Sequence, residues 1–534
     1  MKYIVELKEP LWRKWLRRAL WVIFASLILL AAWTGIAGGL RIVSGIQLKQ
    51  QTGLLAAISP EMGLLLAERF YQKNPTTEAL VIYTKAALEA KAWDLADALG
   101  ERLRKELPGN ATALAYAISA QRGVCGYALP TELQSLAKIP LQNDEELIIA
   151  TRVAVATGNR ELLSSVRRPL SRLSEGDLAD RAALLRAQIS LADGDKAEAA
   201  ERAKSLIEKQ LPARDAVELL GLLGKLNLSE EKDYRSALRV RARAERILTL
   251  ELCDYLWTRE SPAEILNWLE NLPPAIAKVT EVQLRKIALQ KIARMNTKAA
   301  QSTEEIESVA LAESLKMVLE GNSTPTLTNI AKEKDLVGIM RFGQLLQDPT
   351  LELKAAEEFS LRFDQSPFAA ATVIAPARKT RNTETIAKAY SALEKRLSDS
   401  PLTRAKATYW RLLMSPKLER AEYENLKKDC ENFLQREDIR CTMALAHFTL
   451  GSTTDALFAL GDSPQSSRGK FLRGYLLLKS GQPDKAFKIL KEIDERELTD
   501  IESNLLLASK RQIEEASPAK KLFDMLKAPP AFII

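Results

Sequence analysis

Apolar side chains recur every three to four positions along most of the chain, which is the spacing of amphipathic helices. Residues 471–493 (FLRGYLLLKSGQPDKAFKILKEI) show this pattern clearly. Good helix formers occupy 471–479, and the Gly-Gln-Pro sequence at 481–483 ends that helix because proline cannot occupy an interior helical position. Beyond the break, Ala486 and Leu490 share one face of a second helix. The stretch therefore predicts a helical hairpin.

The hairpin resembles the tetratricopeptide repeat (TPR) family. The ~34-residue unit of that family has a small residue in its first helix, Gly at the turn, and Ala followed by a large apolar residue in its second helix. These four roles match Gly474, Gly481, Ala486 and Leu490. The chain departs from the family at Lys470, where an aromatic residue is expected, and at Ile493, where Ala is expected.

The same pattern recurs elsewhere in the chain. The segment 440–460 supplies Ala444, Gly451, Ala456 and Leu460 in the same roles, and the segment 180–206 supplies Ala187, Gly194, Ala199 and Ala203. The segment 87–110 has the aromatic-Asp-x-Ala start of a second helix, with Ala96 at its end. Clear copies cover 59–121, 179–212 and 438–494, while 215–437 matches only loosely. The resemblance implies repeat packing through Ala96, Gly194, Ala199, Ala444, Gly451, Ala456, Gly474, Gly481 and Ala486.

The fold class expected from these patterns is all-α, with an N-terminal transmembrane helix followed by a TPR-like α-solenoid of antiparallel helix pairs. A single hairpin cannot bury its own apolar face, so consecutive hairpins have to stack. Strand-like alternation of β-branched residues is nearly absent. The expected divisions are a basic cytoplasmic segment (1–18), a transmembrane helix (19–40), a helical connector (41–58), the solenoid (59–494), and C-terminal helices with an apolar tail (495–534).

The membrane prediction depends on residues 19–40, which are 22 residues without a charge between Arg18 and Arg41. At ~1.5 Å per residue such a helix would span the hydrocarbon core of a bilayer. Basic residues before it place the N-terminus in the cytoplasm, so we expect a single-pass inner-membrane protein with a periplasmic repeat domain. The alternative is a signal peptide cleaved at the small-x-small sequence Gly35-Ile36-Ala37.

The formal charge of +8 is concentrated before the repeats, where residues 1–49 hold eight basic and two acidic side chains. A nucleic-acid-binding protein would be expected to carry its excess positive charge on the folded domain. The sequence therefore argues against a nucleic-acid partner.

Residues suited to catalysis are scarce. His447 is the only histidine, which excludes multi-histidine metal sites. The four cysteines form no C-x-x-C pair. Cys430 and Cys441 are expected on adjacent antiparallel helices and are a candidate disulfide, with two unpaired buried thiols as the alternative. No phosphate-binding loop or nucleophile elbow occurs. We therefore expect a non-enzyme without a metal or cofactor.

One charged pattern stands out in DYRSALRVRARAERILTL (233–250). Four arginines at helical spacing predict a stripe on a single helix: Arg235, Arg239, Arg243 and Arg246. Such a row of guanidiniums suits carboxylates, phosphates or an acidic protein segment. The alternative is a solvated face whose arginines pair with acidic residues of neighbouring repeats.

The function predicted from the sequence is a membrane-anchored, non-catalytic TPR-like scaffold. It would bind partner proteins or peptides in the bacterial envelope, as an assembly factor or a secretion-linked adaptor. The alternative is a helical scaffold subunit of an enzyme complex that acts on envelope polymers. The sequence leaves the partner and the oligomeric state open.

Overall fold

A computed structural model describes residues 52, 55–176, 178–321, 327, 330 and 332–516, and the chain divides into two compact units, 1–55 and 56–534. Within the described residues the second unit is helical and contains no strand. Its α-helices in chain order are α2 (Pro60–Lys73), α3 (Thr77–Glu89), α4 (Trp93–Glu106), α5 (Ala111–Cys125), α6 (Pro130–Lys138), α7 (Asp144–Thr157), α8 (Arg160–Arg172), α9 (Ala179–Ala192), α10 (Lys196–Lys204), α11 (Ala213–Lys225), α12 (Glu230–Ala242), α13 (Arg246–Leu256), α14 (Pro262–Glu270), α15 (Pro274–Ala277), α16 (Thr280–Ile292), α17 (Asn296–Thr303), α18 (Val309–Leu319), α19 (Glu333–Leu346), α20 (Pro349–Arg362), α21 (Pro367–Lys379), α22 (Thr383–Arg396), α23 (Pro401–Met414), α24 (Arg420–Cys430), α25 (Glu437–Thr449), α26 (Thr453–Leu460), α27 (Ser467–Lys479), α28 (Pro483–Leu490) and α29 (Asp500–Ala516). Two 3₁₀ helices, η2 (Glu431–Phe433) and η3 (Glu495–Glu497), complete the set.

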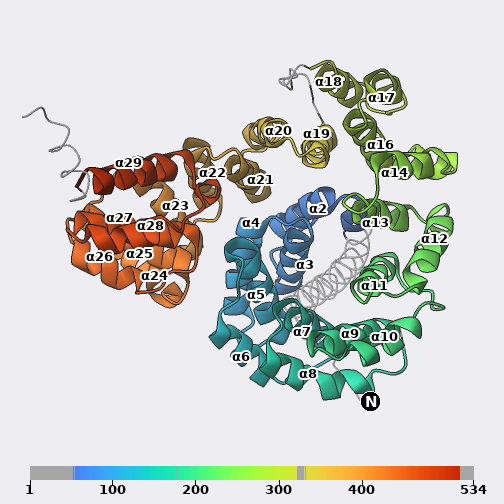
Figure 1. Cartoon of the computed structure of the whole chain (residues 1–534), viewed down its shortest axis with the longest axis horizontal. Coiled ribbons are helices and arrows are strands. Elements are labelled where there is room, and N and C mark those ends of the chain that lie inside the picture. The colour runs from blue at the N-terminus through green and yellow to red at the C-terminus, as the bar shows by residue number, and fades with distance from the viewer. Residues whose placement is uncertain are drawn as a thin grey trace, which may run out of the picture. The chain divides into compact units, whose positions relative to one another are not determined.

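Helices that follow one another in the chain pack as antiparallel pairs with short turns (Figure 1). The pairs include α9 with α10, α21 with α22, α25 with α26 and α27 with α28. Three of the turns need a left-handed residue and have glycine there, with φ of 89° at Gly194, 89° at Gly451 and 79° at Gly481. Stacking of such pairs gives a solenoid-like arrangement, which confirms the all-helical fold expected from the sequence.

Small residues let the paired helices approach closely. A Cβ atom at Gly474 of α27 would overlap the side chain of Leu490 on α28. The alanines expected to pack between helices are fully buried in the structure: Ala96, Ala199, Ala444, Ala456 and Ala486. Burial of these side chains leaves no room for larger ones, so the helix pairs are sensitive to overpacking.

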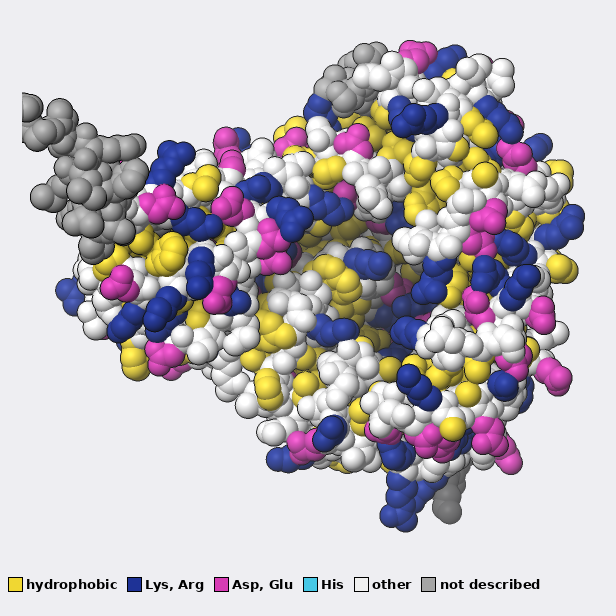
Figure 2. Space-filling view, in the orientation of Figure 1, with side chains coloured by type: hydrophobic (Ala, Val, Ile, Leu, Met, Phe, Trp, Pro, Cys, Tyr) yellow, Lys and Arg dark blue, Asp and Glu magenta, His cyan; other side chains and the backbone are white. Residues whose placement is uncertain are grey.

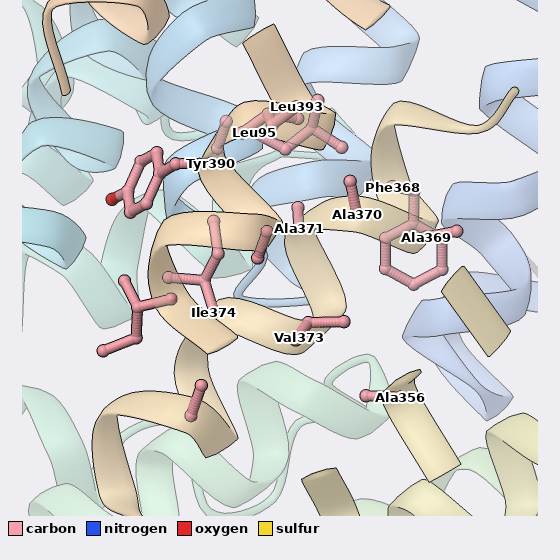
Figure 3. Packing of buried hydrophobic residues seen from close by; sticks show 14 of the residues in the cluster. Leu95, Ala356, Phe368, Ala369, Ala370, Ala371, Val373, Ile374, Tyr390 and Leu393 are labelled. Carbon is pink, nitrogen blue, oxygen red and sulfur yellow. The ribbon is translucent and has the colours of Figure 1, made fainter. Parts of the chain in front are cut away.

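Early and late hairpins also pack against each other within the second unit. Helix α4 contacts α21 and α23, and α2 contacts α19 and α21, although these helices lie about three hundred residues apart in the chain. Figure 3 shows Leu95 of α4 next to a buried cluster on α21 that includes Ala370, Ala371 and Ile374. One hydrophobic core therefore joins α2–α5 to α19–α25.

The predicted location in the inner membrane is corrected by the structure. Among the described residues, no helix is long and apolar enough to cross a membrane. The longest of them, α29, has 17 residues, or about 26 Å, and carries charged side chains, whereas a bilayer core is about 30 Å thick. The segment expected to span the membrane, 19–40, lies outside the described residues, as do 1–18 and the end of the apolar tail (517–534).

Candidate functional site

Three cavities are lined mainly by the first helices of hairpins between α7 and α27, together with the start of α2, the end of α5 and α22. We name them after a residue or helix that each contains: the α11 groove, the Asp254 pocket and the Arg468 pocket. On the face seen in Figure 2, Lys and Arg side chains gather around a hollow. Most residues that line the three cavities therefore belong to first helices, with Tyr390 of α22 as a contribution from a second helix.

The α11 groove has a volume of about 520 Å³ and is lined by residues from α7, α9, α11 and α13 and the turn after α13. Tyr255 lies across α11, where Cβ atoms added at Gly221 and Gly224 would be 3.5 Å and 3.6 Å from its ring and hydroxyl group. The guanidinium carbon of Arg259 is 4.2 Å from the centre of the Tyr255 ring. Leu191 of α9 adds apolar surface. The groove thus offers an aromatic ring, a cation and apolar side chains together.

Buried Asp215 holds the first helices around this groove in place. The carboxylate of Asp215 on α11 accepts hydrogen bonds from Arg152 of α7 at 3.2 Å and from Arg181 of α9 at 2.8 Å. Its side chain is fully buried, so the loss of either guanidinium would leave part of a buried charge without a partner. These contacts fix three consecutive first helices relative to one another.

The Asp254 pocket, of about 240 Å³, lies over α13, α16, α18, α19 and the start of α2. Asp254 accepts two hydrogen bonds from Arg285, at 2.7 Å and 2.8 Å, and one from Arg341 at 2.8 Å. Burial raises the pKa of Asp254, but the nearby guanidiniums more than offset this effect and leave the pKa below its usual value. Glu251, which lines both this pocket and the α11 groove, has a pKa raised by burial.

The Arg468 pocket, of about 220 Å³, takes its walls from the end of α5 and from α21, α22, α23, α25 and α27. Arg468 donates to Glu502 at 2.7 Å, and its guanidinium carbon is 4.5 Å from the ring centre of Trp410 and 5.3 Å from that of Tyr409. The pocket therefore has a guanidinium held over two aromatic rings.

A network of buried charges lies beside this pocket and joins α4 to the late hairpins. Asp97 of α4 accepts from Lys406 of α23 at 2.7 Å and from Arg436 at 2.8 Å and 2.9 Å. Asp94, one turn earlier, accepts from Tyr390 of α22 at 2.5 Å and forms an ion pair with Arg378 of α21 at 3.3 Å. Figure 3 shows the Tyr390 hydroxyl group pointing away from the apolar cluster of α21.

Burial and ion pairing have opposite effects on the pKa values of Asp97 and Lys406. Burial raises the pKa of Asp97, but Arg436 and Lys406 more than offset this effect, so its pKa lies well below the usual value. Burial lowers the pKa of Lys406, and the two aspartates reverse that shift, so its pKa lies above the usual value. Asp97 and Lys406 are therefore both charged at neutral pH.

The predicted arginine stripe does not lie on a single helix, so that prediction is wrong. Helix α12 ends at Ala242 and α13 begins at Arg246, with Arg243 in the turn between them. Consecutive turns at 243–245 interrupt the periodicity on which the stripe depended.

Three of the four arginines form ion pairs with acidic residues of this chain. Arg235 pairs with Glu231 at 2.7 Å and with Glu260 at 2.8 Å, Arg239 pairs with Glu260, and Arg246 pairs with Glu281 at 3.0 Å. Arg243 is exposed. The ion pairs with Glu260 and Glu281 agree with the alternative of pairing with acidic residues of neighbouring repeats.

In the part of the chain that the structure describes, cysteine, histidine and acidic side chains do not form a metal-binding cluster. Burial raises the pKa of Cys125, Cys253 and Cys430 to about 12. All four cysteines are free, so Cys430 and Cys441 form no disulfide. Within the described residues no cluster of His, Cys, Asp and Glu could hold a metal ion. His447 contacts the hydroxyl group of Tyr423 at 3.4 Å, and burial lowers its pKa.

Comparisons with known proteins give similarity to solved structures only. No protein-family model matches the chain, and a search of curated proteins finds no match. Yeast Tom70 is 9% identical, with a TM-score of 0.28, over 91% of this chain and all of that one. The Cut9–Hcn1 hetero-tetramer of the APC/C gives 13% identity and a TM-score of 0.25, with coverage of 85% of this chain and 91% of that chain.

A third structure, Naa15/Naa10 bound to HypK-THB, gives 12% identity and a TM-score of 0.24, with coverage of 91% of this chain and 80% of that chain. These neighbours are TPR-type helical-repeat proteins. Scores this low carry no argument of their own. The TPR-like description of this chain rests on its hairpins, its glycine turns and its buried small residues.

Proposed function

We propose that this protein is a non-catalytic helical scaffold that binds a partner protein or peptide along its first helices, as an adaptor or assembly factor. The observation that carries the proposal is the composition of the α11 groove, whose walls come from several successive hairpins. Because the helices are held in register by Asp215, the groove is preorganised, which lowers the entropic cost of binding an extended segment.

The side chains of the groove suit a polypeptide ligand. Tyr255 and Leu191 offer apolar contact area, while Arg259 stacks on Tyr255 and has no carboxylate partner among the described residues. Aromatic and arginine side chains supply much of the binding energy in protein interfaces. Absence of catalysis is part of the proposal, and it is supported by the raised pKa values of the buried thiols, which leave these groups protonated at neutral pH.

A displayed library of random peptides tests the proposal. The most enriched peptide would be synthesised, and its Kd measured with the wild type, with Tyr255→Ala and with Phe458→Ala. Phe458 is 88% exposed on α26, a second helix, and so provides a matched aromatic control. We expect Tyr255→Ala to weaken binding by about tenfold or more, as for a hot-spot residue, and Phe458→Ala to leave it unchanged. The reverse order, or a library without enrichment, would refute the proposal.

A further inference from the structure

The Arg468 pocket contains hydrogen-bond donors without acceptors. A guanidinium has five N–H groups. The Nε of Arg468 donates to Glu502, but its two terminal amino groups have no hydrogen-bond partner among the described residues. Trp410 and Tyr409 lie against the guanidinium and fix its plane. Four oriented N–H groups are therefore available to a ligand.

Carboxylates near these donors are already occupied. Glu437 accepts hydrogen bonds from the backbone N–H groups of Gln465 and Ser466 at 2.7 Å and 2.9 Å, and also from the Ser466 hydroxyl group. Asp438 accepts from Arg436 at 3.1 Å and 3.0 Å. The third acidic residue of the lining, Glu497, accepts from the hydroxyl group of Ser467. Each acidic residue of the lining thus has a donor other than Arg468.

A second guanidinium lines the same pocket. Arg378 donates to the Tyr390 hydroxyl group at 2.6 Å and pairs with Asp94. Burial lowers the pKa of Arg378, but Asp94 and Tyr390 more than offset this effect and leave the pKa above its usual value, while the positive charge of Arg468 acts against that rise. An anion in the pocket would relieve the repulsion between the two cations.

We propose that the Arg468 pocket binds a carboxylate group, with the terminal amino groups of Arg468 as bidentate donors and Trp410 and Tyr409 as the floor. A planar carboxylate matches the fork of a guanidinium that is fixed by stacking. Where the carboxylate belongs to a peptide, the inference rests on the proposed scaffold function. Where it belongs to a small free acid, the inference is independent of that function.

Binding at this pocket is coupled to the contact between early and late hairpins. Val124, Cys125 and Tyr127, at and after the end of α5, form one wall, and the α21–α27 segment forms the others. A ligand that touches both walls binds the closed arrangement better than an opened one, so it stabilises closure by linkage. Hydrogen exchange at residues 124–127 should therefore slow when the pocket is filled.

The experiment uses glutarate as a free dicarboxylate and glutaramide as its uncharged counterpart, both measured by calorimetry with the full chain. Two labelled peptides that differ only in Glu or Gln provide the peptide arm. Removal of Arg468 alone would leave the buried carboxylate of Glu502 without its cationic partner, so the test variant is Arg468→Gln with Glu502→Gln. The control, Arg404→Gln with Asp429→Asn, removes an ion pair that does not line the pocket.

We expect saturable binding of glutarate or the Glu peptide and at least about tenfold weaker binding of the amide counterpart. The double variant at Arg468 should show the same loss, and the control variant should bind like the wild type. Four results would each overturn the inference. The first two are equal binding of an acid and its amide counterpart, and no saturable binding of glutarate or of the Glu peptide. The other two are unchanged binding by the double variant at Arg468, and tighter binding of inorganic phosphate than of glutarate. Glutarate binding without peptide binding would keep the site and argue against the scaffold function. Peptide binding that is weakened only by Tyr255→Ala would keep the scaffold function and argue against the carboxylate site.

Discussion

Replacement of Asp97 by Asn should weaken the contact between α4 and the late hairpins. The carboxylate is 4% exposed and accepts three charged hydrogen bonds of 2.7–2.9 Å from Lys406 and Arg436. An Asn side chain keeps the shape but removes the charge, so two buried cations would share the remaining acids. Disruption of a buried ion pair by loss of one partner costs about 3–5 kcal/mol, and we expect a loss of stability in this range.

Urea denaturation followed by circular dichroism would measure this loss, with Asp494→Asn as the control. Asp494 pairs with Arg496 in an exposed segment, so its replacement should cause no measurable change. Because a long helical array can unfold in parts, hydrogen exchange of α4, α23 and α25 should accompany the denaturation curves. Equal midpoints for the two variants, with unchanged exchange in α4, would refute the assignment of a stabilising role to this network.

The stability lost in Asp97→Asn should also depend on pH. Ion pairing holds the pKa of Asp97 in the folded protein below its value in the unfolded chain. The contribution of Asp97 to stability is therefore complete above the unfolded pKa of about 3.9, and it is lost as the pH falls toward the folded pKa. The stability difference between the wild type and Asp97→Asn should be largest near neutral pH and should shrink in acid. A constant difference from pH 7 to pH 3 would contradict this reasoning.

Three further predictions concern packing and thiol chemistry. Gly474→Val should lower the melting temperature, because its side chain would overlap Leu490, at a cost of about 1–3 kcal/mol by calorimetry. Ala486→Trp should destabilise the same hairpin by a similar or larger amount, since Ala486 is fully buried, and an unchanged melting temperature would show that the helices can separate freely. The thiols of Cys430 and Cys441 should react with a disulfide reagent at pH 8 only after denaturation, because burial raises both pKa values, that of Cys430 to about 12.

The local parts of the fold could be predicted from the sequence. The break at 481–483 separates α27 from α28 as expected, because proline and glycine have the same backbone preferences in any context. The division of 233–250 into two helices was missed, because its apolar periodicity continues through the turn and hides the interruption. Periodicity reports which side chains share a face only while the helix continues.

The contact between α4 and the late hairpins could not be predicted in this way. Asp97 and Lys406 are 309 residues apart, and nothing in the pattern around either residue indicates which distant hairpin it meets. A weak signal does exist in α4, where Asp94 and Asp97 fall on either side of the buried Leu95 and Ala96. Helical spacing puts both acids on one face beside apolar residues, and buried carboxylates need cationic partners. That reasoning requires basic partners for α4 but does not identify them, because Lys406 and Arg436 come from different hairpins whose positions depend on every turn between them.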